Sequence, residues 1–350
     1  MKLKISHHKL TDIINLKLGV YKPLIEFNSK DDFMEIVKNY KTKKKQFFPF
    51  PIYFDISSEV YRKVKKEKKL ILYFKNTKVC VLKIKNFYKL NKFLIGKKIF
   101  KTNEKKHPGF KHYLNTNEYF INKKIFDLNK KIMKKINFTN PNYIKNIILK
   151  KKIKTIAGFH TRNVPHKGHE WIHSFGLSKC DSLLVQPMIG QFRKNEYKDK
   201  FILKTNQYLI NNVYKRKNVF FGLYNSYPKY GGPREALLHA IVRRNFGCSH
   251  FLIGRDHAGV KNYYKKYESQ KICKKYEKYL GIKILTFNEP FLCNICKKIK
   301  NEKKHGCKKL SIKKISGTYI RSQILKKNLI SKFMMRKEIF RMINKGSIIK

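Results

Sequence analysis

Apolar residues in the second half of the chain occur in short runs that alternate with longer amphipathic stretches. The runs predict strands over 153–159, 182–189, 219–224, 250–253 and 282–287, and the stretches predict helices over 168–177, 199–213, 233–246 and 262–280. Strands and helices that alternate in this way form right-handed crossovers and a parallel, doubly wound sheet. Ligands bind beyond the carboxyl ends of the strands in such a sheet, so we expect the chemistry of the protein there.

The first half of the chain has shorter and more scattered apolar runs. Those at 70–74 and 79–84 predict strands between Lys- and Asn-rich turns, and a helical pattern lies near 31–40. We expect three parts: a β-rich accessory domain over 1–149, the parallel α/β domain over 150–290, and a smaller C-terminal subdomain over 291–350.

Charge is the most unusual property of the composition. The 350 residues include 82 Lys and Arg against 22 Asp and Glu, a formal net charge of +60. Such an excess indicates a polyanionic partner when it is gathered on one face. Here Lys, Asn, Ile, Phe and Tyr are frequent along the whole chain, which favours a general compositional bias, so we do not expect nucleic acid as a partner.

Compartment and redox state follow from two further features. No run approaches the roughly 18 consecutive apolar residues of a membrane span, and the first ten residues lack the apolar segment of a signal peptide. Four of the seven cysteines, Cys80, Cys180, Cys248 and Cys273, are scattered singly, which is typical of reduced core thiols. We therefore expect a cytoplasmic protein.

Polar side chains gather directly after the first predicted strand of the α/β domain. The segment 160–169 reads HTRNVPHKGH and leads into a helix. His166 and His169 are three residues apart, which places both rings on one face of a first helical turn, beside unpaired backbone N–H groups. Two imidazoles, a glycine and a helix N-terminus are typical of a phosphate site. The spacing of the two histidines alone is equally compatible with metal ligands or with plain surface residues.

Three further segments carry similar residue types. The fourth strand ends in GRDHAG (254–259), for which an ordinary turn with a salt bridge is the alternative to a ligand site. The third strand leads to YGGPRE (230–235), where the proline suits the first helical position and Arg234 serves substrate anions or packing. Near the end, ISGTYIR (315–321) places hydroxyl side chains before a helix, as an anion nest or an N-cap.

In this order and context, the four segments resemble the ATP sulfurylase (sulfate adenylyltransferase) family over about residues 154–324. A HxGH segment alone is typical of the wider nucleotidyltransferase superfamily, and GRDHAG makes the resemblance specific. The resemblance implies a PUA-like N-terminal domain and a Rossmann-like nucleotidyltransferase domain. It also implies the conversion of ATP and sulfate into adenosine 5′-phosphosulfate and pyrophosphate, or the reverse, with Mg²⁺ on the nucleotide, and a homo-oligomer.

The resemblance also implies roles for residues at matching motif positions. Arg162 is expected to clamp sulfate, while Thr161 and Asn163 orient the reacting groups. His166 and His169 are expected to stabilise the transition state around the α-phosphate and the departing pyrophosphate. The catalytic set is Thr161, Arg162, Asn163, His166, His169 and Arg255. The ATP and sulfate contacts are His160, Arg162, Asn163, Gly254, Arg255, Asp256, His257, Ala258 and Phe291.

The chain departs from the family pattern at three positions. The family usually has Gln where this chain has His160, usually Arg in place of Lys229, and often Gly in place of Lys261. Sulfate binding is the step that these changes affect. A Gly-x-x-x-x-Gly-Lys-Ser/Thr segment is absent from the sequence, which excludes a fused phosphate-loop kinase from the expected activity.

A separate cluster follows the last predicted strand. Cys293, Cys296, His305 and Cys307 offer four soft or borderline ligands of the kind that hold a structural Zn²⁺. Some family members carry a zinc knuckle here with the order Cys, Cys, Cys, His, and the last two positions are exchanged and closer together in this chain. Three reduced thiols on a Lys-rich loop are the alternative.

Two other functions compete with sulfate adenylylation. One is a nucleic-acid-binding protein that uses the positive charge and a PUA-like domain beside a degenerate catalytic half. The other is a nucleotidyltransferase with a different acceptor. The unbroken GRDHAG segment argues against degeneration, and sulfate-dependent release of pyrophosphate from ATP distinguishes all three.

Overall fold

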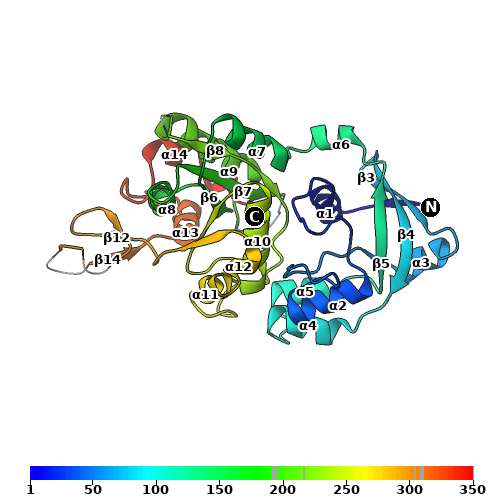
Figure 1. The fold of residues 1–350 in the computed structure, drawn as a ribbon. Coiled ribbons are helices and arrows are strands. Elements are labelled where there is room, and N and C mark those ends of the chain that lie inside the picture. Colours follow the sequence, from blue (N-terminus) through cyan, green and yellow to red (C-terminus); the bar gives the residue numbers. More distant parts are fainter. Residues whose placement is uncertain (191–194, 216, 303–304, 308–310, 350) are drawn as a thin grey trace. The chain divides into compact units, whose positions relative to one another are not determined.

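The computed structural model describes residues 1–190, 195–215, 217–302, 305–307 and 311–349 (Figure 1). The chain divides into two compact units. The first unit consists of Met1–Lys145, Asn225–Gly247 and Asp256–Ile282, and the second of Asn146–Tyr224, Cys248–Arg255 and Lys283–Lys350. Helix α7 (Pro141–Lys150) contains the point at which the chain first passes from one unit to the other.

The first unit is built on a mixed five-stranded sheet with the strand order β1-β3-β4-β5-β2. Its strands are β1 (Lys2–Lys4), β2 (Asp55–Ile56), β3 (Lys69–Phe74), β4 (Thr77–Tyr88) and β5 (Tyr119–Phe126). Its helices are α1 (His7–Lys17), α2 (Lys30–Asn39), α3 (Ser58–Val64), α4 (Lys92–Phe100), α5 (Pro108–Leu114), α6 (Lys130–Lys135), α10 (Pro233–Asn245), α11 (Glu268–Lys275) and α12 (Glu277–Leu280).

The sequence patterns located β3, β4 and α2 and missed several other helices of this unit. Helix α1 is an example, because its polar start (HHKLTD) hides an apolar face on which Leu10, Ile13 and Ile14 are fully buried. Its N-cap is Ser6, whose hydroxyl accepts the N–H of Lys9. A cap of this kind satisfies one of the free N–H groups of a first turn.

The second unit is a parallel, doubly wound sheet covered by helices. Its strands include β6 (Ile156–Thr161), β7 (Ser182–Ile189), β8 (Val219–Phe221), β10 (His250–Ile253) and β11 (Lys283–Thr286), in the order β11-β10-β6-β7-β8. The remaining elements are α8 (Lys167–Leu177), α9 (Asp199–Tyr208), η1 (Leu209–Val213), α13 (Gly317–Leu325), α14 (Lys337–Arg341) and η2 (Lys345–Ser347), and β9 (Tyr224–Asn225) lies where the first unit resumes. The fold class predicted from the alternation of strands and helices is confirmed.

The strand order fixes the place where a ligand binds. After β6 the chain moves outward through β7 to β8, and it later returns to place β10 against the other edge of β6. The switch point of the sheet therefore lies between β6 and β10. Crevices form at the carboxyl ends of strands at such a point. Residues 160–169 and 254–255 follow these two strands directly.

Several predicted elements have other bounds in the structure. The first strand of the α/β domain begins at Ile156 and not at residue 153. The helix predicted over 262–280 is two short helices, α11 and α12, preceded by a turn. Tyr267 is the N-cap of α11 with a left-handed φ of 62°, and such a residue ends regular helical geometry on its N-terminal side.

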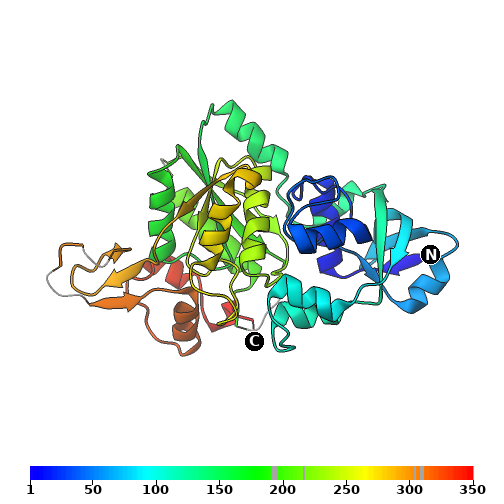
Figure 2. The same ribbon diagram turned by 60° about the horizontal axis from the view of Figure 1, so that its bottom comes forward.

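A small antiparallel sheet completes the second unit. It pairs β12 (Phe291–Cys293) with β13 (Ile299–Lys300) and β14 (Ile312–Lys314). Figure 2 shows that this hairpin extends away from the parallel sheet of its own unit. All eight residues of β7 are buried, and Leu183 and Val185 belong to the main hydrophobic core of the unit.

Two expectations about the chain as a whole can be compared with the structure. Cys80, Cys180, Cys248 and Cys273 are buried free thiols, as predicted. Within the described residues, no helix has the length and the hydropathy that a bilayer span requires.

Candidate active site

The end of β6 presents three polar residues at the switch point of the sheet. Thr161 is buried, and its hydroxyl accepts the backbone N–H of Asn163 at 3.1 Å. The carbonyl of Asn163 accepts a hydrogen bond from the side chain of Asn206 in α9. Arg162 is partly exposed, with its guanidinium 3.8 Å from the carboxylate of Glu196. The turn after β6 is thus fixed by hydrogen bonds while the guanidinium of Arg162 keeps a long, weak ionic contact.

Two histidines cap the N-terminus of α8 reciprocally. The backbone N–H of His169 donates to Nδ1 of His166 at 3.3 Å, and the backbone N–H of His166 donates to Nδ1 of His169 at 3.4 Å. The two rings are stacked, with centroids 3.8 Å apart. Because each Nδ1 accepts a hydrogen bond, each neutral ring carries its proton on Nε2. The cap therefore leaves two Nε2–H donors at a helix N-terminus, where anions bind.

Burial keeps both rings neutral. Desolvation lowers the pKa of His169 to about 4. Desolvation, followed by the neighbouring His169, His173 and Arg321, also lowers the pKa of His166 well below its ordinary value. At neutral pH these rings donate hydrogen bonds as neutral imidazoles, which lets them approach a negatively charged group without releasing or taking up a proton.

Glycines allow the close packing of this region. A Cβ added to Gly168 would lie 3.0 Å from the ring of His166 and 3.2 Å from Ile315. A Cβ added to Gly317 would lie 2.8 Å from the side-chain oxygen of Asn163. The segment around residue 317 therefore packs directly against the turn after β6.

Arg321 is a site residue to which the sequence analysis gave no role. It extends from α13, and its guanidinium donates to the side-chain oxygen of Asn163 and, at 3.2 Å, to the hydroxyl of Thr318. Burial lowers its pKa, with Tyr197 and Glu196 acting in the opposite direction and Arg162 in the same one. The signal in the sequence was ISGTYIR, in which Arg321 lies one helical turn after Thr318. Ser316 itself is the N-cap of α13.

The GRDHAG segment continues from β10. Gly254 and Arg255 follow this strand at the same edge of the sheet as Thr161, because β10 and β6 are parallel and in register. Arg255 forms a close ion pair with Glu289. A guanidinium carries five N–H donors and can therefore bind more than one oxygen atom.

The rest of this segment belongs to the first unit. Asp256 is exposed, and its carbonyl accepts the N–H of Gly259 at 3.0 Å. His257 lies with Nε2 3.0 Å from Nδ1 of His239, and its carbonyl accepts the hydroxyl of Ser269. Ala258 has a left-handed φ of 57°, a conformation that turns its backbone N–H away from the regular path of the chain.

Two predicted contact residues lie elsewhere in the second unit. His160 is the fifth residue of β6, is partly buried, and is in register with Gln186 of β7. Phe291 is buried in β12, with its ring 5.9 Å from that of His305. The ring of Phe291 therefore lies beside the Cys/His cluster of its own hairpin.

The segment 230–235 has a packing role within the first unit. Arg234 is buried and donates to three backbone carbonyls, those of Ile36, Val37 and Pro49, at 3.0 to 3.1 Å. Of the two roles that the sequence left open for Arg234, the structure supports packing. Glu235 accepts the backbone N–H groups of Lys229 and Gly231, which closes the loop before α10.

The four predicted metal ligands come together in the C-terminal hairpin. The ligand atoms of Cys293, Cys296, His305 and Cys307 all lie within 4.8 Å of one another. Nδ1 of His305 lies 3.0 Å from the carbonyl of Glu302, which can only accept, so this nitrogen carries the proton and Nε2 has the lone pair that a metal would need. Three thiolates and one imidazole are a donor set that suits tetrahedral Zn²⁺.

Taken together, the second unit has guanidinium groups, neutral imidazole N–H donors and a helix N-terminus at the switch point of a parallel sheet. These features define a nucleotide-binding α/β protein with a site for anionic groups. The chain belongs to the ATP-sulfurylase family. The sequence model of this family matches residues 136–346, and that of the PUA-like domain matches residues 1–130.

Relatives extend this similarity over nearly the whole chain. The sulfate adenylyltransferase of Ignicoccus hospitalis is 31% identical over 345 residues, 97% of this chain and 89% of the relative. That of Pyrococcus abyssi is 32% identical over 343 residues, 98% of this chain and 89% of the relative. That of Entamoeba histolytica is 31% identical over 280 residues, 77% of this chain and 66% of the relative.

A solved structure shows the same fold. The hexameric APS kinase from Thiobacillus denitrificans matches 97% of this chain with a TM-score of 0.73 and 14% sequence identity. The match spans 62% of the length of that protein. The family expected from the sequence motifs is confirmed by these comparisons, and the PUA-like and parallel α/β folds are confirmed with it.

Proposed function

We propose that the protein is a sulfate adenylyltransferase. A sulfate oxygen attacks the α-phosphorus of ATP and forms a new O–P bond, while the bond between the α-phosphorus and its bridging oxygen breaks and pyrophosphate leaves. Sulfate is already a dianion, so no proton has to be removed, and the protein has mainly to position two anions and stabilise the developing charge. The observation that carries the proposal is the reciprocal histidine cap of α8 beside Arg162 and Arg321 at the sheet switch point.

The first segment supplies the sulfate clamp and the transition-state donors that the family resemblance implies. Arg162 is only weakly engaged by Glu196 and clamps sulfate. Asn163 and Thr161, which are joined to each other by a hydrogen bond, orient the reacting groups. His166 and His169 direct their Nε2–H donors at the α-phosphate and the leaving pyrophosphate. Neutral donors suit this step because they stabilise negative charge as it develops and do not need to change protonation.

The second segment and the hairpin supply nucleotide contacts. Arg255, which follows β10 by two residues, holds ATP. Gly254, Asp256 and His257 complete the ATP contacts, and the backbone N–H of Ala258 contacts sulfate. We also assign His160 to sulfate and Phe291 to the edge of the nucleotide pocket. ATP arrives with Mg²⁺ on its phosphates, which neutralises part of their charge.

Arg321 is an addition to this set. Its hydrogen bond to Asn163 and its electrostatic contact with Arg162 place it beside the proposed sulfate clamp. Two guanidinium groups suit sulfate better than one, because they can form charge-assisted hydrogen bonds to more than one of its oxygens.

We further propose the arrangement of domains, metal and assembly that the sequence predicts. The domains are 1–149, 150–290 and 291–350, and family matches over 1–130 and 136–346 support the first division. Cys293, Cys296, His305 and Cys307 hold a structural Zn²⁺, supported by the convergence of their ligand atoms.

A cytoplasmic location is supported by seven cysteines without a disulfide. We also propose a homo-oligomer.

The test is pyrophosphate release from ATP with and without sulfate, measured on the full chain. We expect release that depends on sulfate and yields adenosine 5′-phosphosulfate. Arg162→Met should lose this dependence, and Arg341→Met, a change at an exposed position of the same unit, should keep it. Release with another acceptor and none with sulfate would overturn the substrate assignment, and release in neither case would overturn the enzyme.

A further inference from the structure

A second polar cavity lies wholly within the first unit. It has a volume of about 150 Å³ and is lined by α1, residues around β2, α5 and the loop that carries Tyr227. At about 30 Å³ for each water molecule, it has room for about five non-hydrogen atoms of that size. An adjoining cavity of about 20 Å³ shares Asp12, Tyr53, His112 and Tyr227 with it.

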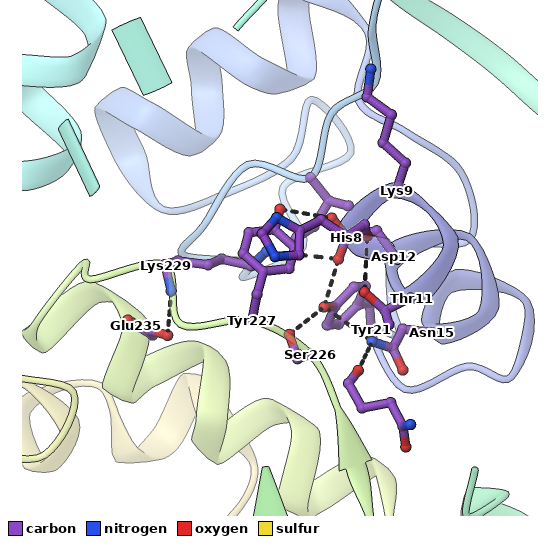
Figure 3. Close-up of polar contacts among 12 residues, drawn as sticks. His8, Lys9, Thr11, Asp12, Asn15, Tyr21, Ser226, Tyr227, Lys229 and Glu235 are labelled. Atoms are coloured by element: carbon purple, nitrogen blue, oxygen red, sulfur yellow. Dashed lines mark hydrogen bonds and ion pairs between the residues drawn. The ribbon is translucent and has the colours of Figure 1, made fainter. Parts of the chain in front are cut away.

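The two carboxylates in the wall are already engaged by donors of the protein. Asp12 is buried and accepts the hydroxyls of Tyr21 at 2.9 Å and Tyr227 at 3.0 Å, as Figure 3 shows. Asp55 accepts the backbone and side-chain N–H groups of Asn117 and pairs with Lys9 at 3.1 Å. Both oxygens of each carboxylate therefore have a partner, and little acceptor capacity is left for a ligand.

Donor groups, in contrast, face the cavity without a partner. Within the described residues, the rings of His8 and His112 and the hydroxyl of Tyr53, which line the cavity, have no hydrogen-bond partner. The hydroxyl of Tyr113, which is 1% exposed and lines the adjoining cavity, has none either. The ring of His8 is stacked on that of Tyr227 with centroids 4.2 Å apart, and His112 meets it edge-on at 5.8 Å. A fully buried hydroxyl without a partner is costly, so Tyr113 indicates an acceptor in the adjoining cavity, which shares Tyr53 and His112 with the larger one.

Charges around the two imidazoles keep them neutral. Burial, reinforced by His112 and Lys229 and opposed by Asp12, lowers the pKa of His8 to about 4. Burial and Lys229 also lower the pKa of His112. The ionisable groups that face the pair from all packed elements are His7, Lys9, Asp12, Asp55 and Lys229. A negative charge among them would offset the lysines and favour protonation of both rings.

We propose that this cavity binds a small inorganic oxyanion, with sulfate as the best fit, at a site separate from the catalytic one. Tyr53 and the two imidazoles offer donors, and the carboxylates are occupied by Lys9 and by other donors of the protein, so the cavity suits a ligand that only accepts hydrogen bonds. Sulfate is such a ligand, whereas phosphate carries a proton near neutral pH that needs an acceptor. Protonation of His8 and His112 accompanies binding, so affinity rises as the pH falls.

The test is NMR of the full chain labelled with ¹³C at histidine Cε1, with His8→Asn and His112→Asn used to assign the two signals. We expect saturable shifts of both signals with sulfate, and apparent pKa values higher by about one unit. Potassium chloride at equal ionic strength should cause no such shifts. Tyr53→Phe should weaken sulfate binding several-fold, since it removes a donor and leaves the ring packing in place.

Controls separate this site from the catalytic one. The Arg162→Met variant, which lacks the proposed catalytic clamp, should show the same shifts with sulfate, and their loss in that variant would overturn the separate site. Equal shifts with chloride, no saturation with sulfate, or tighter binding of phosphate than of sulfate would also overturn the proposal. If the shifts appear with sulfate but sulfate-dependent catalysis does not, the proposed function is overturned and the separate sulfate site stands.

Discussion

The guanidinium of Arg321 in α13 donates a hydrogen bond to the side-chain oxygen of Asn163 at the end of β6, although 158 residues separate them in the chain. This contact connects the last part of the second unit to the first polar segment after the sheet. It also orients the amide of Asn163, because the oxygen must face the guanidinium.

We expect Arg321→Met to lower kcat/KM for sulfate by about two orders of magnitude, the usual loss for a donor to developing charge. Arg321→Lys should recover only a small part, since an ammonium group cannot bond Asn163 and an anion in the same geometry. The measurement is steady-state kcat/KM for sulfate, with Arg341→Met as the control variant. Additive effects of Arg321→Met and Asn163→Ala in a double-mutant cycle would show that the two side chains act independently.

A second prediction separates the cap that His166 makes on α8 from the hydrogen bond that we propose it donates to the nucleotide. Asparagine is a good N-cap, so His166→Asn should keep the free energy of unfolding close to that of the natural protein, whereas His166→Ala should lose about 1 kcal/mol. Both variants should lose about 10²-fold in kcat. Denaturant unfolding and turnover, measured on the same samples, test this. Normal turnover in His166→Asn would mean that the ring is only a cap.

The third prediction concerns the dependence of stability on pH. The pKa of His169 in the folded protein is about 4, below its ordinary value of about 6.5, so the unfolded chain binds the proton more tightly. Stability from the neutral ring is therefore complete above about pH 6.5 and is lost as the pH falls towards 4. His169→Asn should reduce the slope of unfolding free energy in this window by up to about 1.4 kcal/mol per pH unit. An unchanged slope would contradict the assignment.

The fourth prediction concerns the Cys/His cluster. Metal analysis should give about one zinc per chain, with Zn–S distances near 2.3 Å by X-ray absorption. Cys296→Ser should lose the metal and lower the melting temperature. Cys180→Ala, a change at a buried thiol outside the cluster, should keep the metal even where it costs stability. A melting temperature that is unchanged after complete removal of the metal would rule out a structural role for it.

Local patterns in the sequence were sufficient for part of the site. The spacing of His166 and His169 placed two rings on the first turn of a helix, because residues three apart are neighbours there whatever the rest of the fold does. Alternation of strands and helices placed the segments after β6 and β10 at one edge of a parallel sheet, since crossovers have a fixed hand. The clustering of four Cys and His ligands also followed from their short separation in the chain.

Tertiary structure alone decided the partners of each side chain. Whether Arg234 faces an anion or three carbonyls, and whether Arg321 reaches Asn163, depends on segments far apart in sequence that pack side by side. The same is true of the cavity beside His8, whose wall includes Asp55, His112 and Tyr227. Periodicity reports which face of an element is apolar, but the free energy of packing selects its neighbour, and that choice is made among all elements at once.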